Sequence, residues 1–244
     1  MDEYQELSID YDILNPKEVI FQQKDFFKKL IEEFSIKSCL DCACGTGWHL
    51  FMLDELGLNC FGSDLSPSML LIAKKNLLSK QIPLKLVDFR RLSYSWEMKF
   101  DMIICMSTSL PHMLTEVDII AALDSMFRQL NENGILIISN GISDSLLIEK
   151  PKLIPARILK EQAFYFFMEY PTSERVIFNI LNIKKIKNGF QHGFAFIENN
   201  AMKKVDVEKY LTKIPFKKIN YYGNYDFSPY SVKSSKRLII IAQK

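Results

Sequence analysis

One stretch of sequence decides the fold: Leu40-Asp41-Cys42-Ala43-Cys44-Gly45-Thr46-Gly47. It joins a short apolar run to a segment whose apolar residues recur at helical spacing. Glycines at 45 and 47 can adopt positive φ, so the chain can turn tightly and its backbone can approach a ligand closely. The helix that follows would direct free N–H groups and partial positive charge at that ligand. The stretch therefore predicts a strand, a ligand-binding turn and a helix.

Strands and helices are predicted to alternate on both sides of this turn. Helices should begin at Asn15-Pro16, after Gly47, at Ser66-Pro67, and at the capping box of Thr115 and Asp118. The first of these helices should continue to Phe34. The apolar runs that are typical of strands span 36–42, 58–62, 84–87, 100–106 and 135–139. Such alternation predicts a parallel sheet. The right-handed crossover rule then places four residues that follow or end strands along one edge: Asp41, Asp64, Asp88 and Ser107.

The pattern changes after about residue 144. Three strand-like runs, at 164–170, 175–186 and 190–197, lie too close together for helices between them and should pair antiparallel. A short helix near 205–211 and two strands, at 216–222 and 238–242, complete the chain. The prediction is an α/β fold with a Rossmann-like, mostly parallel seven-stranded sheet and helices on both faces. Residues 1–244 should form a single domain, with 145–213 as an antiparallel insertion, or lid, between strands 5 and 6.

Composition excludes several classes of protein. The 244 residues carry a net charge of only +2, which does not favour nucleic acid as a partner. No apolar run is long enough for a membrane span. The acidic N-terminus lacks the basic start and apolar centre of a signal peptide, so we expect a cytoplasmic protein.

The five cysteines lie in or beside strand-like runs, where they are expected to be reduced thiols of the core. Cys42 and Cys44 have no later C-x-x-C or histidine pair to complete a zinc site, so no metal is expected.

Asp64 and Asp41 indicate the kind of ligand. Asp64 ends the strand after the glycine turn, where an acidic residue can accept both hydroxyls of an adenosine ribose. A dinucleotide and S-adenosylmethionine both fit this layout. Dinucleotide folds normally have G-x-G-x-x-G, but the third position here is Leu50. Asp41 would repel a pyrophosphate and suits the ammonium of a methionine group. These residues favour S-adenosylmethionine.

Four segments resemble, in order and spacing, the motifs of class I S-adenosylmethionine-dependent methyltransferases: 40–47, 62–70, 87–90 and 100–105. The resemblance covers about residues 36–140 and the two terminal strands. It implies that the methionine part of the cofactor lies at Asp41, Gly45 and Gly47, the ribose at Asp64, and the adenine at Asp88 and Phe89. Cys105 and Met106 would lie under the ligand. The resemblance further implies that Tyr11, Cys42, Ala43, Leu65, Met69 and Ser107 contact the cofactor.

Residues 105–112 are also similar to the segment after the fourth strand in glycine/sarcosine N-methyltransferases and sugar N,N-dimethyltransferases. This resemblance implies a small-molecule acceptor, with an amine favoured over a hydroxyl. Tyr11 would correspond to an N-terminal tyrosine that this group often has near the cofactor. His112 is the candidate catalytic residue, because a histidine at the strand edge can take a proton from the acceptor or orient it. His49 is interpreted as a packing or surface residue.

Other functions remain open at this point. A nucleic-acid methyltransferase is disfavoured because residues 107–110 lack the Asp/Asn-Pro-Pro-aromatic segment of amino-directed DNA enzymes. A non-catalytic S-adenosylmethionine-binding protein is compatible with the same fold, and a dehydrogenase is a more distant alternative. The chain is expected to be a monomer or a homodimer. Residues 145–213 match no motif and leave the acceptor unnamed.

Overall fold

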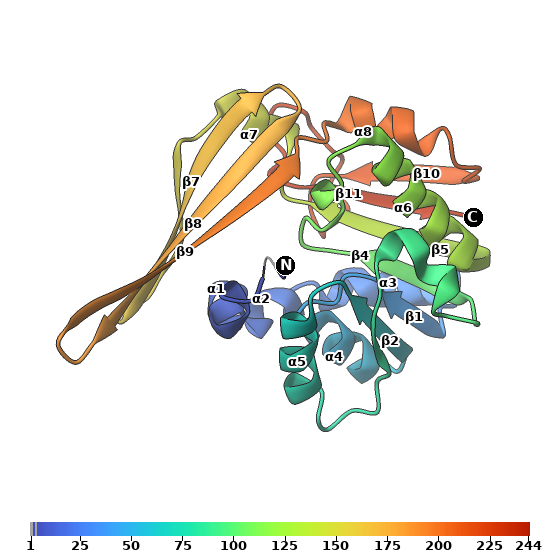
Figure 1. Ribbon diagram of the computed structural model, residues 1–244. Helices are drawn as coiled ribbons and strands as arrows, with labels where there is room; N and C mark the ends of the chain where they lie inside the picture. Colours follow the sequence, from blue (N-terminus) through green and yellow to red (C-terminus); the bar gives the residue numbers. More distant parts are fainter. Residues whose placement is uncertain (1, 3) are drawn as a thin grey trace.

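The computed structural model describes residues 2 and 4–244; Met1 and Glu3, part of the N-terminus used to predict the absence of a signal peptide, lie outside the described residues. Two sheets are present: seven strands in the order β10-β11-β5-β4-β1-β2-β3, and four in the order β6-β7-β8-β9. Figure 1 shows the four-stranded sheet standing beside the larger α/β core. This arrangement confirms the predicted fold class.

The strands of the larger sheet are β1 Ser38–Asp41, β2 Asn59–Asp64, β3 Leu84–Leu86, β4 Phe100–Cys105, β5 Leu130–Asn140, β10 Lys218–Tyr222 and β11 Leu238–Gln243. Neighbours from β5 across to β3 are parallel, whereas β11 is antiparallel to both β5 and β10. Strand order reverses at β1, which has β4 on one side and β2 on the other. In open α/β sheets, ligands bind outside the carboxyl ends of the strands at such a switch point.

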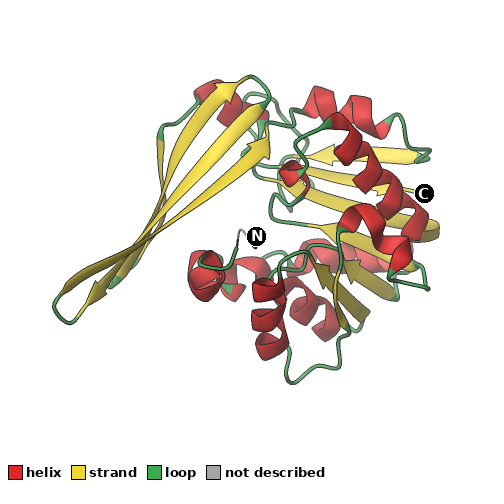
Figure 2. Ribbon diagram, in the orientation of Figure 1, coloured by secondary structure: helices red, strands yellow, loops and turns green. Residues whose placement is uncertain are grey.

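Helices cover both faces of this sheet (Figure 2). Apolar side chains of α3, α4 and α5 form one buried cluster with the sheet, and those of η2, α6 and α8 form another on the opposite face. The helices are η1 Leu7–Asp10, α1 Tyr11–Leu14, α2 Lys17–Phe21, α3 Lys24–Phe34, α4 Trp48–Glu55, α5 Pro67–Asn76, η2 Phe89–Tyr94, η3 Leu110–His112, α6 Glu116–Gln129, α7 Asp144–Glu149 and α8 Lys204–Leu211. The predicted caps form: Ser66 and Thr115 side-chain oxygens accept the N–H groups of Met69 and Asp118.

The second sheet consists of β6 Leu153–Ile158, β7 Gln162–Thr172, β8 Arg175–Ile186 and β9 Gly189–Asn200, all paired antiparallel. Its strands β7 to β9 extend well beyond the core (Figure 1). Phe164, Ile180 and Ile197 on one face pack against Leu7 and Tyr11 of the N-terminal segment. The sequence predicted β7, β8 and β9 but missed β6.

Two local predictions were wrong. The helix expected from Asn15 to Phe34 is two helices, and Pro16 is the N-cap residue of the first; Gln22 and Gln23 separate α2 from α3. Strand β5 begins at Leu130, not at 135, because Leu130 pairs with Phe100 before a register shift. Asn133, with φ 65°, lies within this irregularity. The interruption between α2 and α3 and the early start of β5 depend on contacts between distant segments, which a local hydrophobic pattern does not reveal.

Gly134 should be essential for the irregular part of β5. A Cβ there would lie 2.9–3.2 Å from the carbonyl oxygens of Asn131, Asp101 and Phe100, which are backbone atoms that cannot rotate away. Gly134→Ala is expected to lower the free energy of unfolding by about 1–3 kcal/mol, the usual cost of overpacking. Gly193→Ala in β9 is the control, since its nearest contact would be 4.0 Å away. Equal urea midpoints for the two variants would contradict this assignment.

Candidate functional site

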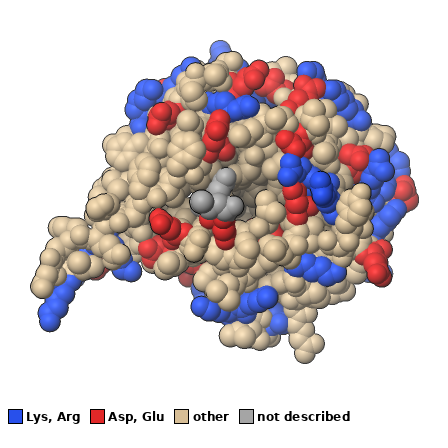
Figure 3. All heavy atoms as spheres, in the orientation of Figure 1, with Lys and Arg blue, Asp and Glu red and all other residues tan. Residues whose placement is uncertain are grey.

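A cavity of about 490 Å³ lies at the carboxyl ends of the central parallel strands. The N-terminal segment and β9 complete its walls. In Figure 3 this face of the molecule is hollowed between the two sheets, with acidic side chains beside the hollow. The sequence-predicted residues that line the cavity are Tyr11, Cys42, Ala43, Gly45, Asp64, Leu65, Met69, Asp88, Phe89, Met106, Ser107 and His112. The structure therefore brings most of the predicted set together, whereas Asp41, Gly47 and Cys105 are absent from the lining residues.

The glycine turn has the predicted backbone. Gly45 and Gly47 have φ values of 51° and 90°. The Gly45 N–H donates to Asp64 Oδ2 at 2.8 Å, which fastens the turn to the end of β2. A Cβ on Gly47 would come within 2.9 Å of the Leu77 side chain. Gly47 therefore permits the turn and close packing of α5, rather than lining the cavity.

Asp64 is held by backbone donors on both oxygens. In addition to the bond from Gly45, Asp64 Oδ1 accepts the Ser66 N–H at 2.8 Å. Burial raises the pKa of Asp64, although these backbone hydrogen bonds favour its charged form. An ionised carboxylate offers about four lone-pair sites, so two remain for ribose hydroxyls.

Asp41 lies just outside the cavity with one oxygen unsatisfied. Its Oδ1 accepts the Ala43 N–H at 3.2 Å, while the buried Oδ2 has no hydrogen-bond partner among the described residues. Burial is the main reason that the pKa of Asp41 rises to about 8, and the charge of Asp64 adds to it. A buried acceptor without a donor is costly. The site therefore fits a ligand with a cationic donor, such as the ammonium of S-adenosylmethionine.

The predicted adenine side of the cavity combines apolar and acidic groups. Leu65 is 62% exposed although it lines the cavity, and Phe89 is another apolar lining residue. Burial opposes the charge of Asp88, but hydrogen bonds from Arg90 hold its pKa below the usual value. The Arg90 guanidinium contacts Asp88 Oδ2 at 2.6 Å. Asp88 is therefore a fixed carboxylate.

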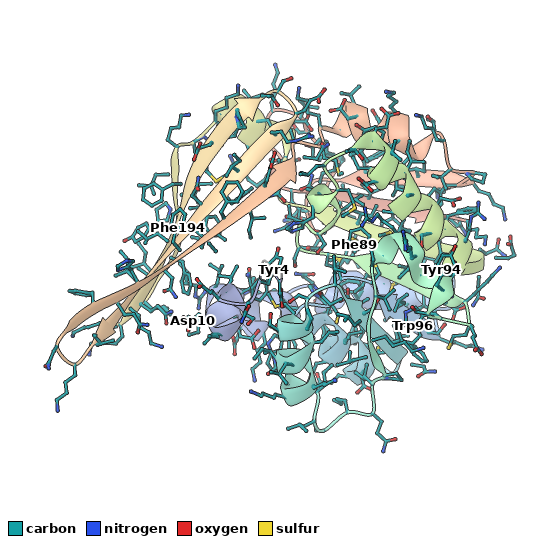
Figure 4. All side chains as sticks on the ribbon, in the orientation of Figure 1. Tyr4, Asp10, Phe89, Tyr94, Trp96 and Phe194 are labelled. Atoms are coloured by element: carbon teal, nitrogen blue, oxygen red, sulfur yellow. The ribbon has the colours of Figure 1, made fainter. Side chains whose placement is uncertain are left out.

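The opposite side contains the loop after β4. Ser107 and Thr108 have φ values of 57° and 71°, an uncommon left-handed conformation for non-glycine residues. Met106 is buried at the cavity wall, and Cys105 is buried within the core. His112, at the end of η3, has its Nε2 2.8 Å from the Tyr4 hydroxyl. Figure 4 shows Tyr4 between the antiparallel sheet and the core.

Several lining residues were missed from the sequence. Asp2 accepts hydrogen bonds from Ser66 Oγ and from Ser68, and Tyr4 reaches His112, more than one hundred residues away. His49, interpreted as a packing or surface residue, is buried and also lines the cavity. The remaining additions include Gln23, Trp48, Glu198, Tyr225 and Arg237. No sequence motif marks these positions, since they meet only through the fold.

The described part of the chain, residues 2 and 4–244, has no group of three or more His, Cys, Asp or Glu residues able to hold a metal ion. None of its helices is both long enough and apolar enough to cross a membrane. All five cysteines are buried and free, as predicted.

Comparisons with known proteins agree with this geometry. Residues 39–134 match the family model described as "Methyltransferase domain". A glycine/sarcosine N-methyltransferase of Parasynechococcus marenigrum is 37% identical over 125 residues, which are 50% of this chain and 44% of the relative. A dTDP-3-amino-3,6-dideoxy-alpha-D-glucopyranose N,N-dimethyltransferase of Streptomyces fradiae is 31% identical over 101 residues, 41% of this chain and 38% of the relative. The matched segments span less than half the length of these two curated relatives.

A crystal structure shows the same overall fold. It is that of a S-adenosylmethionine-dependent methyltransferase from Clostridium acetobutylicum, with a TM-score of 0.82 and 22% identity over 98% of each chain. The fold and the cavity thus define an α/β protein built to bind S-adenosylmethionine. Residues 39–134 thus match a methyltransferase domain, and the chain as a whole has the fold of a S-adenosylmethionine-dependent methyltransferase.

Replacing Asp64 should abolish tight cofactor binding. Asp64→Ala removes the ribose acceptor and leaves the Gly45 and Ser66 N–H groups without their partner. We expect calorimetry to give micromolar binding of S-adenosylmethionine to the wild type, at least about tenfold weaker binding to the variant, and none of NAD. Asp25→Ala removes a carboxylate that is 93% exposed and serves as the control. An unchanged affinity in Asp64→Ala would refute the ribose assignment.

Cofactor binding should release a proton from Asp41. Because its pKa is about 8 without ligand, the carboxyl is mostly protonated at pH 7, and a bound ammonium would favour the ionised form. The affinity should therefore increase as pH rises toward 8 and level off above it. Calorimetry in buffers of different ionisation enthalpy should detect release of up to about one proton. Asp41→Asn should lose that component; identical proton release in both proteins would contradict the proposal.

Proposed function

We propose that this protein transfers a methyl group from S-adenosylmethionine to the amine of a small molecule. One observation carries the proposal: a single cavity extends from the residues of the cofactor motifs to His112 and strand β9. Cofactor and acceptor can therefore share one enclosed space. Its volume of about 490 Å³ is in the range of small-molecule sites.

The chain's task in this reaction is mainly to position the acceptor. S-adenosylmethionine, when bound, supplies a methyl group already activated by the positive charge on sulfur. Holding the acceptor in line with that methyl group can lower the barrier by roughly 7–11 kcal/mol. Met106, Ser107 and His112 line the cavity after β4 and are the residues that we assign to this positioning.

An amine acceptor must be neutral to attack, so a group that takes or orients its proton is needed. We assign this role to His112. Its Nε2 already makes a 2.8 Å hydrogen bond to the hydroxyl of Tyr4, itself a lining residue. The Nε2 side of the ring therefore faces the cavity lining, where a polar group of an acceptor could also be reached.

The acceptor class is supported by the two relatives, both of which are named as N-methyltransferases. An enclosed cavity also favours a small molecule over a nucleic-acid strand. A monomer or homodimer in the cytoplasm is our proposal for the working form. The five free cysteines support that location, because buried thiols persist in reducing compartments.

We further propose that residues 1–244 are one domain in which 145–213 act as an insertion covering the acceptor. Phe196 and Glu198 of β9 line the cavity. The N-terminal segment ties this sheet to the core, since Asp10 accepts a hydrogen bond from Asn182 of β8 and Asp12 accepts one from Asn76 of α5, both at 2.8 Å.

A panel of amines and hydroxy compounds, incubated with labelled S-adenosylmethionine, tests the function. We expect methylated amine products, and His112→Ala should reduce kcat on the accepted substrate by about 10²–10⁴-fold, the usual contribution of a general base. His192→Ala changes a histidine of β9 that is not among the lining residues and should leave turnover unchanged. Cofactor binding without transfer to any acceptor would favour a non-catalytic binding protein. Near-normal turnover in His112→Ala would remove its assigned role.

A further inference from the structure

We propose that the far end of the antiparallel sheet is a docking surface for an anionic lipid bilayer. This end, the sheet tip, consists of residues 158–161 around the turn from β6 to β7 and residues 184–190 around the turn from β8 to β9. Figure 1 shows β8 and β9 carrying the sheet tip away from the α/β core. Among residues 2 and 4–244, the lining of the cavity includes none from the sheet tip, so the inference does not depend on the proposed function.

Strand pairing brings the two turns of the sheet tip together. The Lys185 N–H donates to the Glu161 carbonyl oxygen at 2.8 Å, and Lys185 is opposite Phe190 in the β8–β9 hairpin. Ile158 is aligned, through β7, with Ile183 of β8. Because residues two apart in a strand project from the same face, Ile158 and Phe190 lie on one face of the sheet.

Apolar side chains of the sheet tip are open to solvent. Phe190 is 72% exposed and Ile158 is 63% exposed, and Leu159 and Ile186 are exposed as well. Neighbouring apolar side chains that stay exposed mark a site of interaction with a protein or a membrane. The sheet tip projects from the molecule (Figures 1 and 3), so its occupant must close around it. The headgroup region of a bilayer can do so, because it is fluid.

Lysines surround these apolar side chains at four positions: Lys160, Lys184, Lys185 and Lys187. Figure 3 shows their positive charge at the projecting end. Glu161 is the one acidic residue of the sheet tip and lies 3.6 Å from Lys185, and Asp10 of η1 lies 4.0 Å from Lys184. The other two lysines have no ion pair within residues 2 and 4–244. The sheet tip therefore carries an excess of positive charge.

This charge favours a bilayer over a protein as the occupant. Lysine is depleted in protein–protein interfaces, whereas each lysine beside an anionic membrane raises binding about fivefold. A twofold contact centred on the sheet tip would bring the lysines of two copies together, which opposes a dimer at this place. Aromatic and aliphatic side chains beside lysines are typical of surfaces that enter the boundary between headgroups and acyl chains. Such a contact is peripheral and requires no membrane-spanning segment.

Cosedimentation of the full chain with sucrose-loaded vesicles tests the docking surface. The vesicles contain phosphatidylcholine alone or with about 30% phosphatidylserine. We expect binding to the anionic vesicles only, and loss of that binding as the salt concentration rises. Replacing three lysines together, by Lys160→Gln, Lys185→Gln and Lys187→Gln, should weaken binding about 100-fold. Phe190→Ser should weaken it about tenfold. Lys184 is left in place because it contacts Asp10.

Matched control variants change the same residue types elsewhere. Lys213→Gln, Lys217→Gln and Lys218→Gln together remove an equal charge from exposed positions of the α/β core. Tyr94→Ser removes an aromatic side chain that is 87% exposed and lies across the core from the antiparallel sheet (Figure 4). Both controls should bind anionic vesicles as the wild type does.

A second measurement reads the sheet tip directly. An environment-sensitive dye is attached through Asn188→Cys, which gives an exposed thiol in a chain whose five cysteines are buried. Its emission should shift to shorter wavelength when anionic vesicles are added, because the tip would enter a less polar medium. This variant keeps every lysine and apolar side chain of the sheet tip.

Binding to anionic vesicles, with the dye shift and with losses confined to the tip variants, would support the docking surface. A protein that does not sediment with anionic vesicles, a dye that does not shift, or equal losses in the controls would overturn it. A dimer that Phe190→Ser dissociates, in a protein that ignores vesicles, would identify a second copy as the occupant instead. None of these measurements involves methyl transfer, so the proposed function stands or falls separately.

Discussion

The hydrogen bond from the Gly45 N–H to the Asp64 carboxylate is the interaction on which the site depends. It joins the turn after β1 to the end of β2, on one side of the point where strand order reverses. On the other side, the Cys42 N–H donates to the Ile104 carbonyl oxygen of β4. The turn is thus fixed from both neighbouring strands, and its glycines can hold a left-handed backbone where a ligand must approach.

The same edge of the sheet would be an open crevice without the N-terminal segment and the antiparallel sheet. Tyr4 reaches His112, and Asp10 reaches Asn182 of β8. These contacts link three parts of the chain around one cavity (Figures 1 and 4). A cavity enclosed in this way excludes water, which strengthens the electrostatic interactions inside it. Segments far apart in sequence would therefore position an acceptor together.

Two ionisable groups of the site remain incompletely compensated in the protein itself. Asp41 has a buried oxygen without a hydrogen-bond partner among the described residues, and its raised pKa keeps it mostly protonated at pH 7. Arg237 lines the cavity and forms no ion pair with a carboxylate of the described residues. Burying polar or charged groups of this kind without full compensation lowers stability. Opposite charges on one amino-acid-like ligand would compensate both. The site therefore suits a ligand that carries both an ammonium and a carboxylate.

The sequence by itself determined the α/β class, the turn at Gly45, and the acidic residues Asp41 and Asp64. Hydrophobic periodicity, glycine content and the order of the motifs are local properties, and they act over a few residues. Tertiary structure alone decided that Asp2 and Tyr4 reach the cavity and that Arg237 lies in its wall. It also decided the break between α2 and α3, the early start of β5 and the burial of His49. The physical reason is that these features depend on strand pairing and side-chain contacts between segments that no spacing in the sequence relates.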